Sequence, residues 1–378
     1  MKKIRFIQLS WVLSLAVVVL GVSFITPALA TGNSARHSAH TTGSVAGTSI
    51  AATIYITSAT LQPMFQSHID QQVPTAMNNA INAMVSKLPK QDQGWAMEMA
   101  TTLIQPAATV VSLTPQSNGL ALTLLLSLYP GDPHPIKTGL LISFSPLNSS
   151  TVQVSAGPLN GGPALASGPQ STFSVPIGTL NAVKTTPSCG SAALALNLQI
   201  PVALGQAASI SQVAATTGHH NPMAVRQKGD TNAGVNTFIE IPASSISSLG
   251  SSMGSMPVGN GLTAQNIRVG VNGNNLEVTS DIYWSGIDIG VADTTIAPGA
   301  GNGKLVLHVL NTSFSIFGLF TFPMNSYNQQ IQQTLNAKLS GAFAGKFTVN
   351  SAAIGPDSQL PCAASNSLVI SGTSSIGG

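Results

Sequence analysis

A large excess of apolar over charged residues constrains the fold of this chain more than any other feature. Hydrophobic residues make up 43% of the sequence and charged residues 7%, a balance typical of membrane-embedded proteins. Beyond residue 30, however, the apolar run 119–129 is too short to cross a bilayer, and 305–322 is interrupted by polar residues. We therefore expect the apolar residues to be buried inside a folded protein.

The first thirty residues have the pattern of a secretory signal peptide. Lys2, Lys3 and Arg5 precede an apolar run over 11–25, and small residues precede a cleavage position after Ala30. This pattern predicts a secreted or otherwise extracytoplasmic protein. The alternative is that the segment stays uncleaved and anchors the N-terminus in a membrane.

The chain without this signal peptide has no formal net charge and two cysteines. Three of the 14 Lys and Arg residues are lost with the signal peptide and none of the 11 Asp and Glu, so 11 charges of each sign remain. A neutral surface argues against a nucleic-acid partner and against electrostatic docking on anionic lipids. Cys189 and Cys362 are predicted to form one disulfide in an oxidising compartment, the alternative being two buried free thiols.

Periodicity predicts helices and strands that each have one apolar face. A helix over 65–88 has apolar residues at steps of four and three, and a helix over 327–339 has them at steps of four. A strand over 120–128 alternates leucine with other residues after the turn pair Asn118–Gly119. Further expected strands are 49–58, 138–144, 151–156, 172–176, 192–202, 237–241, 267–271, 276–284, 304–309, 314–322, 347–349 and 368–371, and further short helices are 95–103 and 242–249.

These elements predict an α+β fold in which long curved antiparallel sheets wrap around amphipathic helices. The predicted segments are a signal peptide over 1–30, a disordered segment over 31–48, a first half over 49–204, a polar linker or surface loop over 205–235 and a second half over 236–378. The two halves resemble each other faintly, for example at 111–129 and 267–284. A duplication explains this likeness, and so does the patterning that all alternating strands share.

No group of residues has the spacing that catalysis or metal binding requires. Ser252 lies in a G-x-S-x-G motif, but a helix is predicted before it where a nucleophile elbow needs a strand. The glycine-rich segment 299–304 lacks the residues and the following helix of a phosphate loop. The other candidates have no partners at ligand or acid–base spacing, and they are His37, His40, Asp132, His134, His219, His220, Asp281, Asp288 and Asp293. We expect no enzyme, no cofactor and no metal site.

The second half resembles a known family in the order of its elements. A strand, a short helix and a hairpin of long strands are followed by Gly303–Val309, the pairs Phe317–Gly318 and Phe322–Pro323, and an amphipathic helix. The segments Gly345–Val349 and Ser367–Gly372 come last. Over Thr237–Gly372 this order resembles the TULIP (tubular lipid-binding) modules, especially exported bacterial phospholipid-binding ones.

The TULIP resemblance implies a sheet wrapped on a long helix with lipid held between them, and it transfers no catalytic residue. The first half, with a long helix before long strands, is similar in outline. The polar segment 205–235 departs from the family pattern and leaves open whether the chain forms one module or two.

We therefore expect a non-enzymatic protein that binds or carries a lipid or another apolar molecule, with an acyl chain held between helix and sheet. Methionine and phenylalanine make adaptable linings, and a membrane surface is an expected transient partner. The residues expected to line the site are Phe65, Ile69, Met77, Ile81, Leu122, Leu124, Leu305, Leu307, Phe314, Phe320, Met324, Ile331 and Leu335. The alternative is an extracellular surface or matrix interaction protein with a solid core and no ligand.

Overall fold

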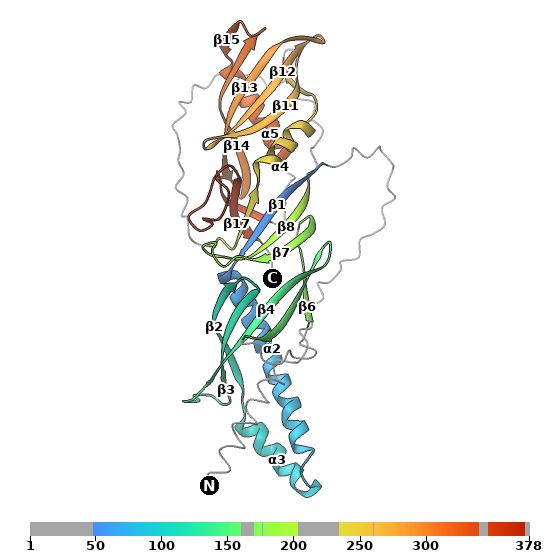
Figure 1. Ribbon diagram of the computed structural model, residues 1–378, viewed down its shortest axis with the longest axis vertical. Coiled ribbons are helices and arrows are strands. Elements are labelled where there is room, and N and C mark those ends of the chain that lie inside the picture. Colours follow the sequence, from blue (N-terminus) through green and yellow to red (C-terminus); the bar gives the residue numbers. More distant parts are fainter. Residues whose placement is uncertain are drawn as a thin grey trace, which may run out of the picture. The chain divides into compact units, whose positions relative to one another are not determined.

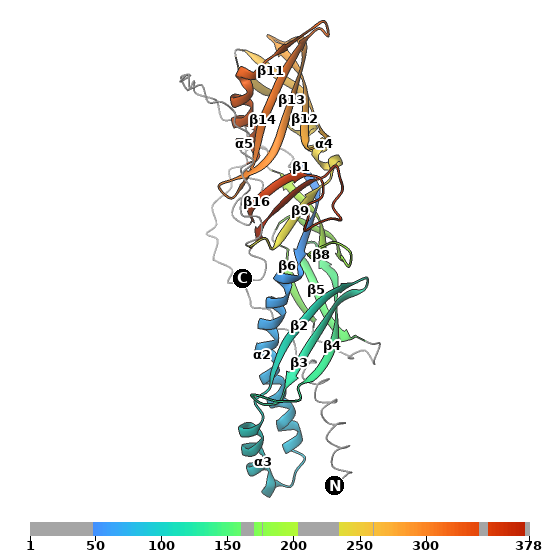
Figure 2. The same ribbon diagram turned by 90° about the vertical axis from the view of Figure 1, so that its left-hand side faces the viewer.

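The computed structural model describes residues 48–159, 170–175, 177–202, 234–259, 261–339 and 347–374. The predicted signal peptide, nearly all of the predicted disordered segment and most of the predicted linker lie outside these residues. The chain divides into two compact units, one mainly Ile56–Val175 and Leu180–Leu196, the other mainly Asn197–Gly378 with the strand residues up to Tyr55. Each unit has a curved antiparallel sheet of its own (Figures 1 and 2).

A further sheet of six strands has the order β16-β17-β9-β1-β8-β7. Its strands are β1 (Thr48–Thr57), β7 (Thr179–Thr185), β8 (Ala192–Val202), β9 (Thr237–Ile241), β16 (Phe347–Ile354) and β17 (Leu368–Ser374).

The Tyr55 hydroxyl donates to the Glu240 carboxylate at 2.7 Å, and the other oxygen of that carboxylate accepts from the Ala364 N–H at 2.8 Å. Burial, and then this hydrogen bond, raise the pKa of Tyr55 above its usual range.

The first unit packs a long helix against a five-stranded antiparallel sheet. Its helices are α2 (Ser58–Val85) and α3 (Lys90–Leu103), and its sheet runs in chain order through β2 (Ala107–Gln116), β3 (Gly119–Ser127), β4 (Ile136–Asn148), β5 (Thr151–Pro158) and β6 (Gln170–Ser174). Helix α2 begins after Thr57, whose hydroxyl accepts from the Thr60 N–H at 3.2 Å. Its apolar stripe is buried at Ile69, Val73 and Ile81.

The second unit has a six-stranded antiparallel sheet and two helices. Its elements are α4 (Ala243–Ser252), β10 (Met256–Gly259), β11 (Leu262–Asn272), β12 (Asn275–Trp284), β13 (Ile287–Gly301), β14 (Lys304–Ile316), β15 (Phe320–Pro323), the 3₁₀ turn η1 (Asn325–Tyr327) and α5 (Asn328–Leu339). Strands β10 to β15 pair in chain order, so each joins its neighbour as a hairpin. Helix α4 packs against β11, and α5 packs against β14.

In each unit, side-chain amides of a helix bind backbone groups of a strand that no further strand pairs, on β2 in the first unit and on the first part of β14 in the second. In the first unit the Gln66 amide donates to the Ala108 carbonyl at 2.8 Å and accepts from the Val110 N–H at 2.7 Å. In the second unit Asn336 accepts from the Leu307 N–H at 2.8 Å and donates to the Leu307 carbonyl at 3.1 Å. These amides satisfy backbone groups that a further strand would otherwise pair, which protects the edge of the sheet.

The predicted α+β class with curved antiparallel sheets is confirmed, and the main differences lie at turns. Strands β2, β7 and β10 and most of β13 were not predicted. The predicted strand 314–322 is instead the end of β14, a turn at Phe317–Gly318 and β15. Gly286 belongs to the turn between β12 and β13. Next to Asn311, β14 contains a β-bulge, because Leu310 is skipped in the pairing of β14 with β13.

Both halves of the chain repeat one order of elements. Each has a strand (β1 or β9), then a helix (α2 or α4), then an antiparallel meander, and finally two strands of the six-stranded sheet (β7 and β8, or β16 and β17). This repeated order favours the duplication over the chance likeness of alternating strands. Helix α5 has no counterpart at the same place among the described residues of the first half.

Cys189 and Cys362 are both disulfide-bonded, which confirms the predicted disulfide. A disulfide is typical of proteins in oxidising compartments outside the cytoplasm. Within the described part of the chain, no helix combines the length and the apolar character needed for a membrane crossing.

Candidate functional site: an apolar cavity in the second unit

An apolar cavity of about 70 Å³ lies in the second unit and is lined by the curved sheet and by α5 with its leading turn. Alternate residues of β11 to β14 point toward it, since successive side chains of a strand face opposite sides of a sheet. The lining residues are Met256, Val258, Leu262, Ala264, Ile267, Val278, Ser280, Ile282, Ala292, Thr294, Ile296, Thr312, Phe314, Met324, Tyr327, Ile331 and Leu335. Figure 2 shows α5 beside the strands of this sheet.

A β-bulge in β11 keeps the apolar residues of that strand in phase with the cavity. Ala264 and Ile267 are three residues apart and would face opposite sides of a regular strand, but both line the cavity. The pairing with β12 shifts between Gln265 and Arg268, and Asn266 has a φ of 49°. Asparagine tolerates this left-handed conformation better than most residues, so Asn266 places Ile267 inward at low cost.

Three buried hydroxyl side chains are part of the otherwise apolar lining of the cavity. Ser280 on β12, Thr294 on β13 and Thr312 on β14 line the cavity and are at most 7% exposed. Thr294 and Thr312 are cross-strand partners, and the Thr294 hydroxyl donates to the Thr312 hydroxyl at 3.4 Å. Together with Tyr327 they give the cavity a few polar points in an apolar lining, which is the usual composition of a small-molecule site.

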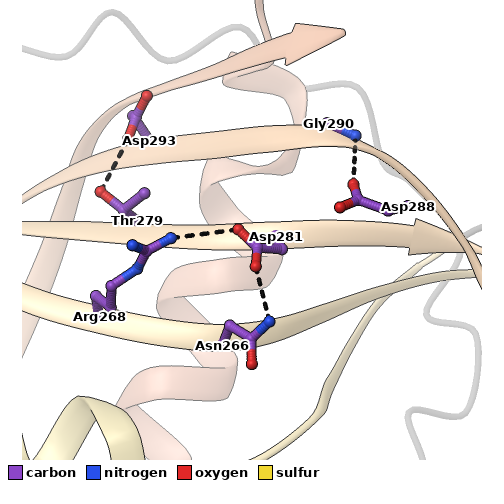
Figure 3. Close-up of polar contacts among 7 residues, drawn as sticks. All are labelled: Asn266, Arg268, Thr279, Asp281, Asp288, Gly290 and Asp293. Atoms are coloured by element: carbon purple, nitrogen blue, oxygen red, sulfur yellow. Dashed lines mark hydrogen bonds and ion pairs between the residues drawn. The ribbon is translucent and has the colours of Figure 1, made fainter. Parts of the chain in front are cut away.

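The opposite face of this sheet is polar, and its carboxylates are paired (Figure 3). Asp281 accepts from the Asn266 amide at 2.7 Å and lies 3.4 Å from the Arg268 guanidinium. Asp293 accepts from the Thr279 hydroxyl at 2.9 Å, and Asp288 accepts from the Gly290 N–H at 3.0 Å. These aspartates lie off the apolar face of the sheet, and they bind neighbours on the sheet instead of one another.

The residues predicted to line a ligand site in the second half fall into three groups. Phe314, Met324, Ile331 and Leu335 line the cavity. Leu305 and Leu307 are buried on β14 but are not part of the lining. Phe320 lies outside the cavity with 64% of its surface exposed, because it belongs to β15 just after the turn at the end of β14.

The residues predicted in the first half are mostly core residues. Ile69 and Ile81 are buried on α2, and Leu122 and Leu124 are buried on β3. Phe65 is half-buried. The side chain of Met77 lies outside the described part of the structure.

Several lining residues were not predicted from the sequence. Met256 and Val258 lie on β10, a four-residue strand containing proline that gives no alternation to detect. The hydroxyl residues Ser280, Thr294 and Thr312 are in phase with the apolar residues of their strands, and this phase is the signal that could have found them.

The catalytic motifs considered from the sequence do not form their required geometries. Ser252 ends helix α4, and its hydroxyl donates to the Leu249 carbonyl at 2.7 Å instead of lying at a strand-to-helix elbow. The segment 299–304 comprises the end of β13, the turn Asn302–Gly303 and the first residue of β14. Asp132 accepts from the N–H groups of Leu128 and His134, as in a rigid turn.

Metal binding finds no support in the part of the chain that is described. No group of three or more His, Cys, Asp or Glu residues there is placed to hold a metal ion. His37, His40, His219 and His220 lie outside the described residues.

Comparison with known proteins adds one weak similarity. No family model and no curated protein matches the chain. Among solved structures, the crystal structure of P47 of Clostridium botulinum E1 aligns with 86% of this chain and 100% of its own, at 8% sequence identity and a TM-score of 0.32. A similarity of this size assigns neither a fold family nor a function.

Proposed function

We propose that the protein binds or carries a lipid or another apolar molecule and holds an acyl chain in the cavity of the second unit. The observation that carries this proposal is the cavity itself, whose wall is apolar except for three hydroxyl residues and one tyrosine. An alkyl chain needs no hydrogen bonds and gains about 25 cal/mol for each Å² of apolar surface that it buries. The TULIP resemblance of the second half, with lipid between sheet and helix, supports the same function.

The size of the cavity indicates how a ligand would enter. About 70 Å³ is less than the roughly 150 Å³ of an enclosed cavity that binds benzene, and less than the roughly 300–1,000 Å³ of typical ligand sites. The cavity therefore matches a short length of alkyl chain, and a larger ligand requires lining side chains to move. Met256 and Met324 are suited to that movement, because methionine has three rotatable bonds and no branch.

Native mass spectrometry and organic extraction of protein purified from a membrane-containing host test this proposal. We expect a bound apolar molecule that is released by extraction. The variant Ala292→Phe places a large side chain in the cavity and should retain much less of the bound molecule. The control variant Ala353→Phe, at an exposed position of β16, should retain as much of it as the wild type. Protein that carries no lipid, and binds none when offered, would favour the alternative of an interaction protein with a solid core.

A further inference from the structure

Two neighbouring hairpins at one end of the second unit's sheet expose large apolar side chains. The hairpin of β12 and β13 turns at Ser285–Gly286, and that of β14 and β15 turns at Phe317–Gly318. Both turns lie at the same end of the sheet, since Gly290 on β13 pairs with Ile316 on β14. The tip formed by these hairpins comprises Trp284, Ile287, Phe317, Leu319, Phe320 and Phe322, which are 46–75% exposed.

The backbone at Phe317 indicates that this exposure has a function. Phe317 has a φ of 47° and Gly318 a φ of 70°, and the Leu319 N–H donates to the Ile316 carbonyl at 2.9 Å. A β-turn with positive φ at both central residues favours Asn-Gly, whereas a bulky residue in the left-handed region is strained. Phe317 is nevertheless 67% exposed, so packing within the fold does not offset the strain. Strained residues of this type cluster at functional sites.

The charges around the tip limit what can cover it. Asp281 is three residues from Trp284 along β12, which places it roughly 10 Å from the turn at about 3.3 Å per residue. Asp288 is the nearest carboxylate, and it is turned back onto the Gly290 N–H (Figure 3). Asp288 is two residues from Gly286, so the end of the sheet beyond it is uncharged over roughly 7 Å at about 3.3 Å per residue. This length lies within the roughly 5–10 Å to which apolar protein surfaces enter the interface of a bilayer.

We propose that this tip inserts shallowly into the surface of an uncharged, zwitterionic lipid bilayer. The tip consists of two hairpin ends without basic side chains, so it suits neither a protein interface of about 800 Å² per partner with its hydrogen bonds nor attraction to anionic lipid. A bilayer accepts apolar side chains without matched shape. Tyr283 and Trp284 lie where amphipathic aromatic rings meet the headgroups, and Asp288, opposite Tyr283 in the pairing, stays at that level.

The tip also borders the cavity. Trp284 pairs with Leu262, and Phe322 pairs with Phe314, and both partners line the cavity. Cross-strand partners share one face of a sheet, so these two aromatic residues lie at its rim. Docking itself does not depend on the proposed lipid-binding function, but if both hold, the docked tip is where a lipid passes between bilayer and cavity.

Flotation of the full chain with phosphatidylcholine vesicles tests the docking. We expect binding that is the same at low and high salt, and about tenfold weaker binding for the double variant Phe317→Asn/Leu319→Ser. The melting temperature of this variant should be unchanged or higher, because asparagine relieves the strain at position 317. Leu310→Ser, at an exposed leucine of the β14 bulge outside the tip, should bind as the wild type does.

Fluorescence locates the contact independently. In a Trp11→Phe/Trp95→Phe background, Trp284 is the one remaining tryptophan, and its emission should shift to the blue when vesicles are added. Docking is refuted if wild type fails to float, if the double variant floats equally well, or if the blue shift is seen in the wild type but is absent from the variant that keeps only Trp284. Binding that requires anionic vesicles and is lost at high salt would also refute docking on an uncharged bilayer. Wild-type protein that floats with vesicles but retains no lipid would reject the proposed function and leave the docking proposal standing.

Discussion

Three X-Gly pairs show how single residues set hairpin turns in the second unit. Ser285–Gly286, Asn302–Gly303 and Phe317–Gly318 each connect neighbouring strands, and the residue before each glycine has a positive φ. Serine and asparagine are small polar residues that are common in turns, whereas phenylalanine is large and apolar. The sequence alone shows the glycines, but it does not show that Phe317 adopts this conformation, because phenylalanine argues for a strand.

At the residue scale, His68 predicts a pH dependence of stability. Burial lowers the pKa of this side chain on α2 below its usual value of 6.5. The folded state therefore binds the proton more weakly than the unfolded state, so this contribution is fully present above about pH 6.5 and is lost as the pH falls through the folded-state pKa. The free energy of unfolding, measured with urea, should decline between pH 7.5 and pH 5, and His68→Gln should make this decline smaller. Equal slopes for both proteins would contradict this account.

At the scale of elements, helix side chains take the place of a missing strand. β15 pairs with β14 only from Ser313 to Ile316, which leaves the first part of β14 without a strand on that side. Asn336 binds both backbone groups of Leu307, and Gln332 accepts from the Val309 N–H at 3.0 Å. The polar side of each helix thus has a structural role that is independent of its apolar stripe.

Removing the Asn336 amide should destabilise the second unit. Asn336→Ala leaves the N–H and C=O of Leu307 without these partners, which is expected to cost about 1–3 kcal/mol of unfolding free energy. Gln333→Ala, at an exposed position of the same helix, should change it by no more than about 0.5 kcal/mol. Chemical denaturation of both variants under the same conditions compares their free energies of unfolding. Equal values would show that the unpaired edge of β14 does not need the Asn336 amide.

Elements with strong periodicity were predictable and short or mixed ones were not. The leucines of β3 alternate over the whole strand, and the stripe of α2 repeats over many turns, so both were located from sequence. β10 has four residues with a proline, and β7 mixes exposed and half-buried residues. Gln66 and Asn336 could not be distinguished from solvated amides, because a polar side chain looks the same in sequence whether it binds water or a strand edge.

The candidate site was predicted in part for the same reasons. Phe314, Met324, Ile331 and Leu335 were identified by apolar periodicity and line the cavity. Phe320 was assigned to the wall because 314–322 was interpreted as one strand, and the turn after Ile316 separates it from that wall.

At the scale of the whole molecule, the disulfide is the main covalent constraint. It joins cysteines far apart in the sequence, and in the chain-entropy model closing such a loop contributes about 4–5 kcal/mol. We expect a reducing agent, or the double variant Cys189→Ser/Cys362→Ser, to lower the melting temperature. The reducing agent should have no further effect on the double variant. A wild-type protein that melts at the same temperature before and after complete reduction would exclude this stabilising role.

Photo-crosslinking with a fatty acid that carries a diazirine near the end of its acyl chain tests the central claim most directly. After irradiation and digestion, mass spectrometry identifies the labelled peptides. The account predicts labels on cavity residues of β11 to β14 and α5, such as Ile282, Phe314 and Leu335, with strongly reduced labelling in Ala292→Phe. Labels confined to exposed residues such as Phe320, or labelling that Ala292→Phe leaves unchanged, would contradict it.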